Sequence, residues 1–309
     1  MEQVVDLRQF GAWYGDVAYA AASPAQRMDI VLPEGEGPFP VVVFIHGGGF
    51  LVGDKRRGVM ASVVKMVSQG YAVASLNYRL SSEARWPAQI HDAKAAIRFL
   101  RARGREYRLE TEKLAVCGNS AGGHLSCMLA AAPNHPELEN RSMGYGEQSD
   151  HIDGLVSWYA MTDLVRDAEQ RRCLNLEPAT FEGMSMDDVV TRFLGISAQD
   201  DPELAAAASP IRYVTKDFPP ALFQHGTADR IVPYLQSVEM ADRINMLCGI
   251  DHSEVILFPR EGHGHEGDRF KSDENLIRCI QFIDSIYGIR RGTPMVLPGI
   301  RLCDASELV

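Results

Sequence analysis

The chain has 309 residues, of which 46% are hydrophobic and 23% are charged, and its formal net charge is −10. The apolar content is that of a folded globular protein and excludes a disordered chain, which lacks the apolar residues that offset ordering entropy. The acidic balance disfavours nucleic acid and anionic membrane surfaces as partners, because like charges repel.

Six short apolar runs, each bounded by Gly or Pro, predict strands that are buried on both faces. They lie at residues 41–45, 71–76, 114–117, 155–159, 221–224 and 255–258. Four stretches with apolar positions at helical spacing predict helices at residues 87–103, 121–132, 235–247 and 274–287. This alternation predicts an α/β fold with a doubly wound, mostly parallel sheet covered by helices.

Two polar, weakly periodic stretches interrupt the alternation, at residues 134–150 and 164–208. Ligands of open α/β sheets bind at the carboxyl ends of the strands, and both stretches follow such ends. We therefore expect both 164–208 and 134–150 to lie over a site, with 164–208 as a small lid insertion. Surface decoration is the alternative interpretation.

The beginning of the chain contains Glu2 and Asp6 and has no apolar segment typical of a signal peptide. No apolar run approaches the roughly 20 residues of a membrane span. A cytoplasmic protein without membrane contact is therefore expected. Six cysteines without CxxC spacing fit free thiols in a reducing compartment.

A serine flanked by glycines lies between a predicted strand and a predicted helix. Residues 118–122 match the pattern GxSxG, with Ser120 at its centre. A strand directly before and an Ala-rich helix directly after are the context that a nucleophile elbow requires. We expect Ser120 to have a strained backbone and an exposed hydroxyl, and Gly118 and Gly122 to leave room where strand and helix nearly touch. A Gly-rich turn with an incidental serine is the alternative.

A Gly-rich loop at residues 46–50, His-Gly-Gly-Gly-Phe, follows the first predicted strand. Acyl transfer places negative charge on a former carbonyl oxygen, which fixed backbone N–H groups stabilise without reorganising. Because glycine has no side chain, the backbone N–H groups of this loop can come close to such an oxygen. The loop is therefore a candidate oxyanion hole. Phosphate binding is disfavoured, since the sequence has neither GxGxxG nor GKS/T. Two histidines are expected to be structural: His46, which braces the loop, and His124, which packs beneath the elbow.

A serine nucleophile needs a base, and the base needs a carboxylate that orients it. In proteins with a GxSxG elbow, the acid and then the histidine follow the serine along the chain. Asp229 follows the strand at 221–224, and His263 follows the strand at 255–258. Both loops open at the sheet edge where Ser120 lies, so these three residues are the expected catalytic set.

Two alternatives to this set stay open. His265 could replace His263 as the base, and Asp163 is the rival acid, although it precedes the expected lid. The residues His263, His265 and Glu266 could also ligate a metal. No further cluster at ligand spacing supports a metal site, so neither a metal nor another cofactor is expected.

Taken together, the motifs resemble bacterial α/β-hydrolase esterases, in particular the feruloyl-esterase-like branch related to hormone-sensitive-lipase-like carboxylesterases. The motifs HGGGF, NYRL, WPAQIHD, GNSAGGHL, SPI, PPALFQHGTADRIVP and GHGH occur in the family's order between residues 25 and 287. The resemblance implies the α/β-hydrolase fold and esterase activity. By position it implies a triad of Ser120, Asp229 and His263, with oxyanion N–H donors at Gly48, Gly49 and Ala121.

The chain departs from the family pattern at both ends. Only 45 residues precede HGGGF, so the acyl pocket is expected to depend mainly on 164–208. The tail, residues 288–309, lies outside the resemblance, and it is either disordered or packs Met295–Leu302 on a neighbouring molecule. Residues 1–309 are expected to form one domain, because the three catalytic residues must meet at one sheet edge.

The function implied is hydrolysis of a small, short-acyl ester through an acyl-enzyme, with acetylated or feruloylated sugars as substrates by analogy. Acyl transfer to another acceptor, cleavage of short peptides, and ligand binding on an inactive hydrolase scaffold are the alternatives. The complete Ser/Asp/His set disfavours the last of these. The net charge of −10 fits a neutral ester better than an anionic polymer, and a homo-oligomer is left open.

Overall fold

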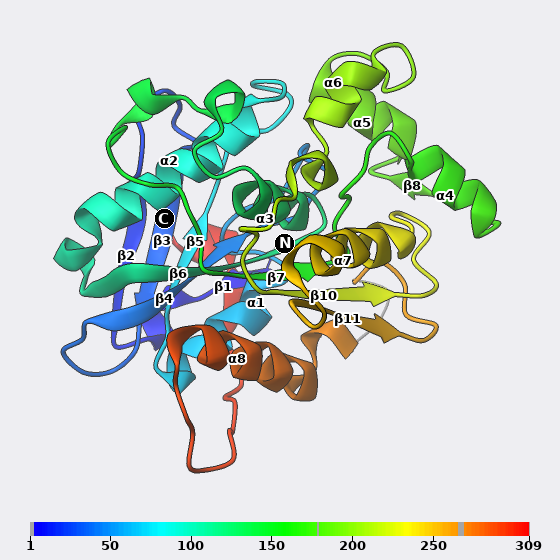
Figure 1. Cartoon of the computed structure of the whole chain (residues 1–309). Helices are drawn as coiled ribbons and strands as arrows, with labels where there is room; N and C mark the ends of the chain where they lie inside the picture. Colours follow the sequence, from blue (N-terminus) through cyan, green and yellow to red (C-terminus); the bar gives the residue numbers. More distant parts are fainter. Residues whose placement is uncertain (1–2, 178, 265–268, 309) are drawn as a thin grey trace.

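The computed structural model describes residues 3–177, 179–264 and 269–308. Its central feature is a twisted eight-stranded sheet in the order β11-β10-β7-β6-β4-β5-β3-β2 (Figure 1). The strands are β2 (Ala12–Ala18), β3 (Arg27–Leu32), β4 (Phe39–Ile45), β5 (Ala72–Leu76), β6 (Leu109–Asn119), β7 (Gly154–Trp158), β10 (Ala221–Gly226) and β11 (Ser253–Phe258).

The six strands expected from the sequence all form and are parallel to their neighbours among them. The strands β2 and β3 are additional: β3 pairs antiparallel with β5, and β2 pairs antiparallel with β3 at the edge of the sheet. The apolar-run criterion misses β2 because it is half exposed and its register shifts between Tyr14 and Val17. The sheet is therefore mostly parallel, as predicted, with an antiparallel edge.

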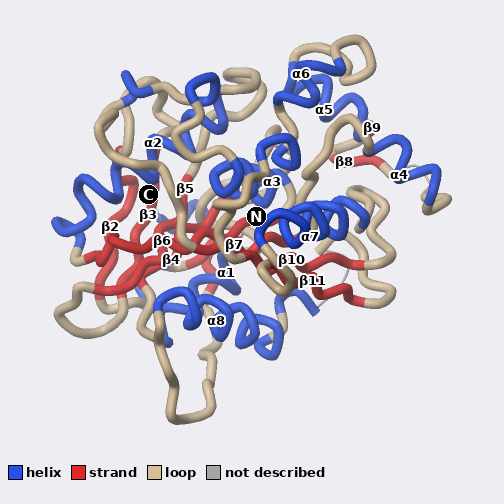
Figure 2. Tube along the Cα trace, in the orientation of Figure 1, coloured by secondary structure: helices blue, strands red, loops and turns tan. Residues whose placement is uncertain are grey.

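Helices cover both faces of the sheet (Figures 1 and 2). One face carries α2 (Ala88–Arg103), α3 (Ala121–Ala131) and α7 (Leu235–Cys248), and the other carries α1 (Met60–Val63) and α8 (Asp273–Tyr287). The four predicted helices are confirmed to within about one residue at each end. Short 3-10 helices lie at Leu7–Gln9, Val64–Gln69, Gly104–Tyr107, Pro136–Leu138, Arg141–Met143, Pro210–Tyr213, Arg269–Lys271 and Ala305–Leu308. None of the described helices has both the length and the apolarity needed to cross a bilayer.

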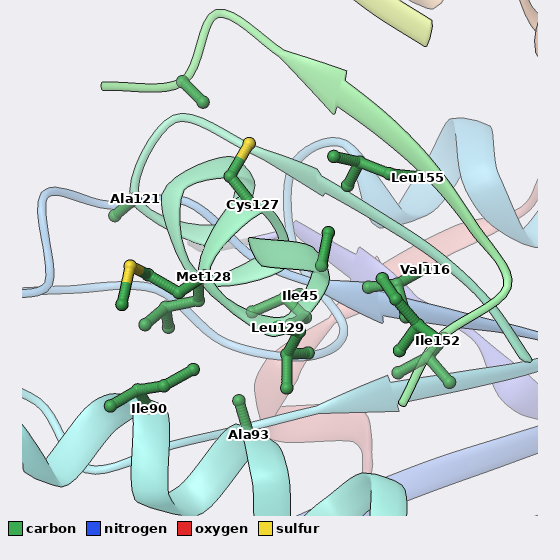
Figure 3. Close-up of a cluster of buried hydrophobic side chains, with 14 of the residues drawn as sticks. Ile45, Ile90, Ala93, Val116, Ala121, Cys127, Met128, Leu129, Ile152 and Leu155 are labelled. Carbon is green, nitrogen blue, oxygen red and sulfur yellow. The ribbon is translucent and has the colours of Figure 1, made fainter. Parts of the chain in front are cut away.

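Apolar side chains fill the space between each helical layer and the sheet. In Figure 3, Ile90 of α2 and Met128 of α3 lie in a cluster with Ile45 and Val116 from the central strands. All four side chains are 1% exposed or less. Burial on this scale stabilises the fold by roughly 25 cal/mol per Å² of apolar surface and fixes the strand ends that carry the site.

The segment 164–208 forms a mixed insertion at the carboxyl side of the sheet, at the upper right of Figure 1. It contains α4 (Asp167–Cys173), β8 (Thr180–Phe181), β9 (Met184–Ser185), α5 (Met186–Leu194) and α6 (Pro202–Ala207). The segment 134–150 lies instead along α2, where Lys94 pairs with Asp150 at 2.6 Å. The expectation that 134–150 covers the site is therefore wrong, because buried ion pairs hold it on that helix.

The C-terminal tail packs on its own chain. Its strand β12 (Leu302–Asp304) pairs antiparallel with β1 (Gln3–Val5). Leu297 is 9% exposed and belongs to the apolar cluster beneath α8. This arrangement differs from both alternatives considered for the tail, because the partner of 302–304 is a strand at the other end of the same chain.

Candidate active site

Ser120 lies at the tight junction between β6 and α3. Its backbone has φ 52° and ψ −120°, a conformation that costs a non-glycine residue free energy and clusters at functional sites. A Cβ on Gly118 would meet the backbone of Gly122, and a Cβ on Gly122 would meet the carbonyl of Ile45. The strained serine and the close approach of strand and helix are as the motif predicts.

A continuous chain of hydrogen bonds links Ser120, His263 and Asp229. The Nε2 atom of His263 lies 2.9 Å from Ser120 Oγ, and its Nδ1 atom lies 2.7 Å from Asp229 Oδ2. Since the carboxylate only accepts, Nδ1 carries the proton and Nε2 presents a lone pair to the serine hydroxyl. The structure thus brings together the three residues expected from the sequence, whereas His265 lies outside the described residues.

The Asp229 carboxylate is buried and receives hydrogen bonds at both oxygens. Its Oδ1 atom accepts the backbone N–H groups of Ile231 at 2.8 Å and Val232 at 2.9 Å. Burial raises the pKa of this carboxyl, but the charge of His263 and the hydrogen bonds from His225 and His263 outweigh burial and hold the pKa well below its usual range. Asp229 is therefore ionised at neutral pH and can stabilise an imidazolium at His263.

The Gly-rich loop is fixed by contacts on both sides. The N–H of Gly47 donates to Asn119 Oδ1 at 3.1 Å, and the Nδ1–H of His46 donates to the carbonyl of Gly47 at 2.7 Å. The His46 ring also stacks on Tyr78 with centroids 4.5 Å apart. Burial lowers the pKa of His46, which keeps the ring neutral. His46 therefore braces the loop, as predicted.

The candidate oxyanion donors lie on either side of Ser120. Gly48 and Gly49 have φ values of 121° and 60°, which favour glycine, and a Cβ on Gly48 would meet the carbonyl of Val52. Ala121 is the first residue of α3, where backbone N–H groups have no partner within the helix. Because Gly47 donates to Asn119, the loop presents Gly48 and Gly49 as its remaining candidate donors.

Two other residues weighed as alternatives have structural contacts. His124 is fully buried, and its Nδ1 atom lies 2.8 Å from the carbonyl of Met161, so it packs beneath the elbow as expected. The rival acid Asp163 accepts the N–H groups of Val165 and Arg166 at 3.0 and 3.1 Å. Asp163 therefore stabilises a turn, and the carboxylate in contact with His263 belongs to Asp229.

The alternative metal site has no support in the part of the chain that the structure describes. No group of three or more His, Cys, Asp or Glu side chains is placed there to hold a metal ion. Of the three ligands considered, His263 contacts Ser120 and Asp229. The other two, His265 and Glu266, lie outside the described residues.

A small cavity of about 190 Å³ opens beside Ser120. The loop at 46–59 forms one wall, and Phe181 from the β8–β9 hairpin and Lys271 also line the cavity. A Cβ on Gly49 would meet the ring of Phe181, so the insertion touches the Gly-rich loop directly. The expectation that the pocket depends mainly on 164–208 is therefore wrong for this cavity, because the loop at 46–59 supplies most of its lining and the insertion contributes Phe181.

Tyr159 is a site residue that sequence reasoning does not identify. It directly follows β7 with φ 40°, lines the cavity, and packs its ring edge-on against His263 with centroids 4.7 Å apart. A Cβ on Gly264 would meet the Tyr159 ring. Burial raises the pKa of the Tyr159 hydroxyl, which therefore stays protonated. Tyr159 fixes the orientation of the imidazole and has no motif of its own.

Comparison with known proteins identifies the family. A family model described as BD-FAE matches residues 28–244. The chain belongs to the BD-FAE family. The matched range includes Ser120 and Asp229, whereas His263 lies beyond it. The resemblance inferred from the motifs is therefore confirmed at the level of the family.

Curated relatives of this BD-FAE member are esterases. Esterase LipC from Mycobacterium tuberculosis is 30% identical over 257 residues, which cover 82% of this chain and 59% of LipC. Esterase LipQ from the same organism is 29% identical over 233 residues, which cover 74% of this chain and 52% of LipQ. The chain therefore spans between half and three fifths of the length of these relatives.

Solved structures show the fold. A truncated carbohydrate esterase from gut microbiota matches with a TM-score of 0.79 at 24% identity, covering 92% of this chain and 99% of that chain. An acetyl ester-xyloside bifunctional hydrolase from Caldicellulosiruptor lactoaceticus matches with a TM-score of 0.67 at 23% identity, covering 85% and 90%. The BD-FAE member described here thus has the α/β-hydrolase fold, as expected.

Proposed function

We propose that this BD-FAE member is a serine carboxylic ester hydrolase that acts on small, short-acyl esters through an acyl-enzyme. The observation that carries the proposal is the hydrogen-bonded chain from Ser120 through His263 to Asp229, with separations of 2.9 and 2.7 Å. A serine hydroxyl in contact with a neutral imidazole nitrogen can lose its proton as it attacks a carbonyl carbon. The esterase names of the curated relatives agree with this reaction.

In the acylation step, His263 Nε2 takes the hydroxyl proton while Ser120 Oγ bonds to the ester carbonyl carbon. The carbonyl oxygen becomes an oxyanion, which the N–H groups of Gly48, Gly49 and Ala121 stabilise. Asp229 stabilises the imidazolium that forms. The C–O bond to the alcohol then breaks, and the alkoxide leaves with the proton from His263.

In the deacylation step, the same base activates water. His263 Nε2 takes a proton from the water as its oxygen attacks the acyl carbon, and a second oxyanion forms in the same place. The bond to Ser120 Oγ breaks, the serine regains its proton from His263, and the carboxylic acid leaves. Each proton thus passes through one nitrogen atom, whose position is fixed by Asp229.

The cavity favours a short acyl group. Its volume of about 190 Å³ is below the roughly 300–1,000 Å³ of pockets that hold drug-sized ligands. The ring of Phe181 lies over Gly49 and limits how far the cavity extends on that side. Acetylated sugars are the substrate class we favour, because a small acyl group fits this cavity and two structural relatives are named a carbohydrate esterase and an acetyl ester-xyloside bifunctional hydrolase.

The proposal is tested by replacing the nucleophile. The variant Ser120→Ala should fold normally and lose at least about 10⁴-fold in turnover of p-nitrophenyl acetate, because no covalent intermediate can form. A panel of p-nitrophenyl esters and acetylated xylosides then compares acyl lengths and leaving groups. Turnover by Ser120→Ala equal to that of the unmodified protein would rule the proposal out.

A further inference from the structure

A second histidine lies against the candidate catalytic carboxylate. His225 is near the end of β10, and none of its surface is exposed. Its Nε2 atom lies 3.2 Å from Asp229 Oδ2 and 3.0 Å from the carbonyl oxygen of Val232. On the other side of the ring, Nδ1 lies 2.8 Å from the hydroxyl oxygen of Ser237 in α7.

These contacts determine which ring nitrogen of His225 carries a proton. Both partners of Nε2, a carboxylate and a carbonyl, are acceptors, so Nε2 must donate. The hydroxyl of Ser237 can donate to Nδ1, so a neutral ring satisfies both of its nitrogens. Ser237 is also fully buried, and it therefore holds the His225 ring in one orientation.

The result is a carboxylate that accepts from four N–H donors. Asp229 Oδ2 lies between the Nδ1–H of His263 and the Nε2–H of His225. Its Oδ1 atom accepts from the backbone of Ile231 and Val232. Donors on both oxygens prevent the carboxylate from rotating, and the second imidazole shares the charge that would otherwise act on His263 alone.

We propose that His225, held in place by Ser237, is a positioning residue for ester hydrolysis. It fixes the Asp229 carboxylate in line with His263 and weakens the hold of that carboxylate on a protonated His263. It never touches the substrate and acts only through Asp229. The inference rests on the proposed function, because it assigns His225 a role in the same triad.

Two other titratable groups, on neighbouring elements, lie close enough to interact with the charge of Asp229. Tyr159 follows β7, and the charge of Asp229 contributes to keeping its hydroxyl protonated. Asp167 of α4 lies close enough to be affected by the charge of Asp229, and it forms an ion pair with Arg171 at 2.6 Å. Since that acid already has a cationic partner, His225 is, outside the proposed triad, the side chain whose removal changes the surroundings of Asp229 most directly.

The test compares two substitutions of the same histidine. His225→Leu removes the donor, and His225→Gln keeps an N–H donor on a side chain of similar length. For each variant, kcat and KM for p-nitrophenyl acetate and the pH dependence of kcat/KM are measured. The matched control is His252→Leu, since His252 Nε2 lies 2.6 Å from the carbonyl of Phe218 at the opposite end of the sheet.

We expect His225→Leu to lower kcat about 10-fold with little change in KM, and to move the acidic limb of the kcat/KM profile to higher pH by about 0.5 to 1 pH unit. The limb moves in this direction because the Asp229 carboxylate, when its charge is no longer shared with His225, stabilises a protonated His263 more strongly. His225→Gln should restore both kcat and the limb, and His252→Leu should leave both unchanged. If His225→Leu does not fold, Ser237→Ala should give a smaller change in the same direction.

An unchanged acidic limb in an active, folded His225→Leu variant would overturn the inference, whether or not kcat falls, because a merely structural role does not alter the basicity of the triad. Failure of Gln to rescue the limb would also contradict it. These outcomes are distinct from failure of the proposed function. In that case Ser120→Ala itself would remain active, and no triad would exist for His225 to position.

Discussion

Replacing the Asp229 carboxylate with an amide of the same shape should disable the base. The carboxylate of Asp229 only accepts, and it faces N–H donors at both oxygens. In Asp229→Asn, one of the two positions becomes an NH₂ group. If the NH₂ faces Ile231 and Val232, it opposes backbone N–H groups that cannot change their protonation. The variant amide will therefore turn its oxygen to the backbone and its NH₂ to His263.

An NH₂ group facing His263 Nδ1 forces the ring to accept there and to carry its proton on Nε2. That nitrogen lies 2.9 Å from Ser120 Oγ and can no longer take the serine proton. The corresponding substitution in a triad typically costs about 10⁴ in kcat, which is about 5.5 kcal/mol of barrier at 1.36 kcal/mol per tenfold. We expect KM to change little, since Asp229 does not line the cavity.

The assay measures initial rates on p-nitrophenyl acetate, with circular dichroism as a check of folding. Asp163→Asn is the matched control, because Asp163 uses Oδ1 to accept from Val165 and Arg166, and an amide oxygen can do the same. That variant should keep more than about half of the activity. A loss below tenfold in Asp229→Asn, or an equal loss in both variants, would refute the reasoning.

Two further predictions concern the cavity and acid stability. Phe181→Ala should raise kcat/KM for p-nitrophenyl hexanoate relative to the acetate by about 10-fold, because it opens the wall at Gly49; an unchanged ratio across an acyl-length series would contradict this. Burial lowers the pKa of His124 from 6.5 to about 4, so the unfolded chain binds more protons between these values and stability falls as pH falls through that window. In urea titrations, His124 should account for about 2 kcal/mol of the stability lost between pH 7 and pH 5, and His124→Asn should lose correspondingly less; equal losses would show that the ring is not buried in its neutral form.

The elements and residues that sequence predicts well are those with a local physical signature. The central parallel strands are continuous apolar runs, and β4, β6 and β10 each end directly at a motif. Ser120 is identified by two glycines whose missing side chains let β6 and α3 approach. Asp229 and His263 follow strands of the same parallel sheet, so topology alone brings them to one edge.

The rest depends on contacts that no local pattern encodes. Tyr159 meets His263 only because β7 and β11 flank β10, and its strained backbone leaves no mark in the sequence. The partner of His225 in α7 depends on how that helix packs over β10. Asn119 occupies the variable position of GxSxG, yet its Oδ1 accepts a hydrogen bond from the N–H of Gly47 in the loop that follows the neighbouring strand β4. The half-exposed β2 has no continuous apolar run, and the tail pairs with the other end of the chain.

The central claim is that Ser120 is a nucleophile activated by His263. Labelling with a fluorophosphonate tests it most directly, because the reagent bonds to an activated serine far faster than to an ordinary hydroxyl group. Intact-mass and peptide analysis should show one adduct per chain, located on Ser120, with loss of p-nitrophenyl acetate turnover in proportion to labelling. No adduct, or an adduct at another residue while turnover persists, would contradict the account.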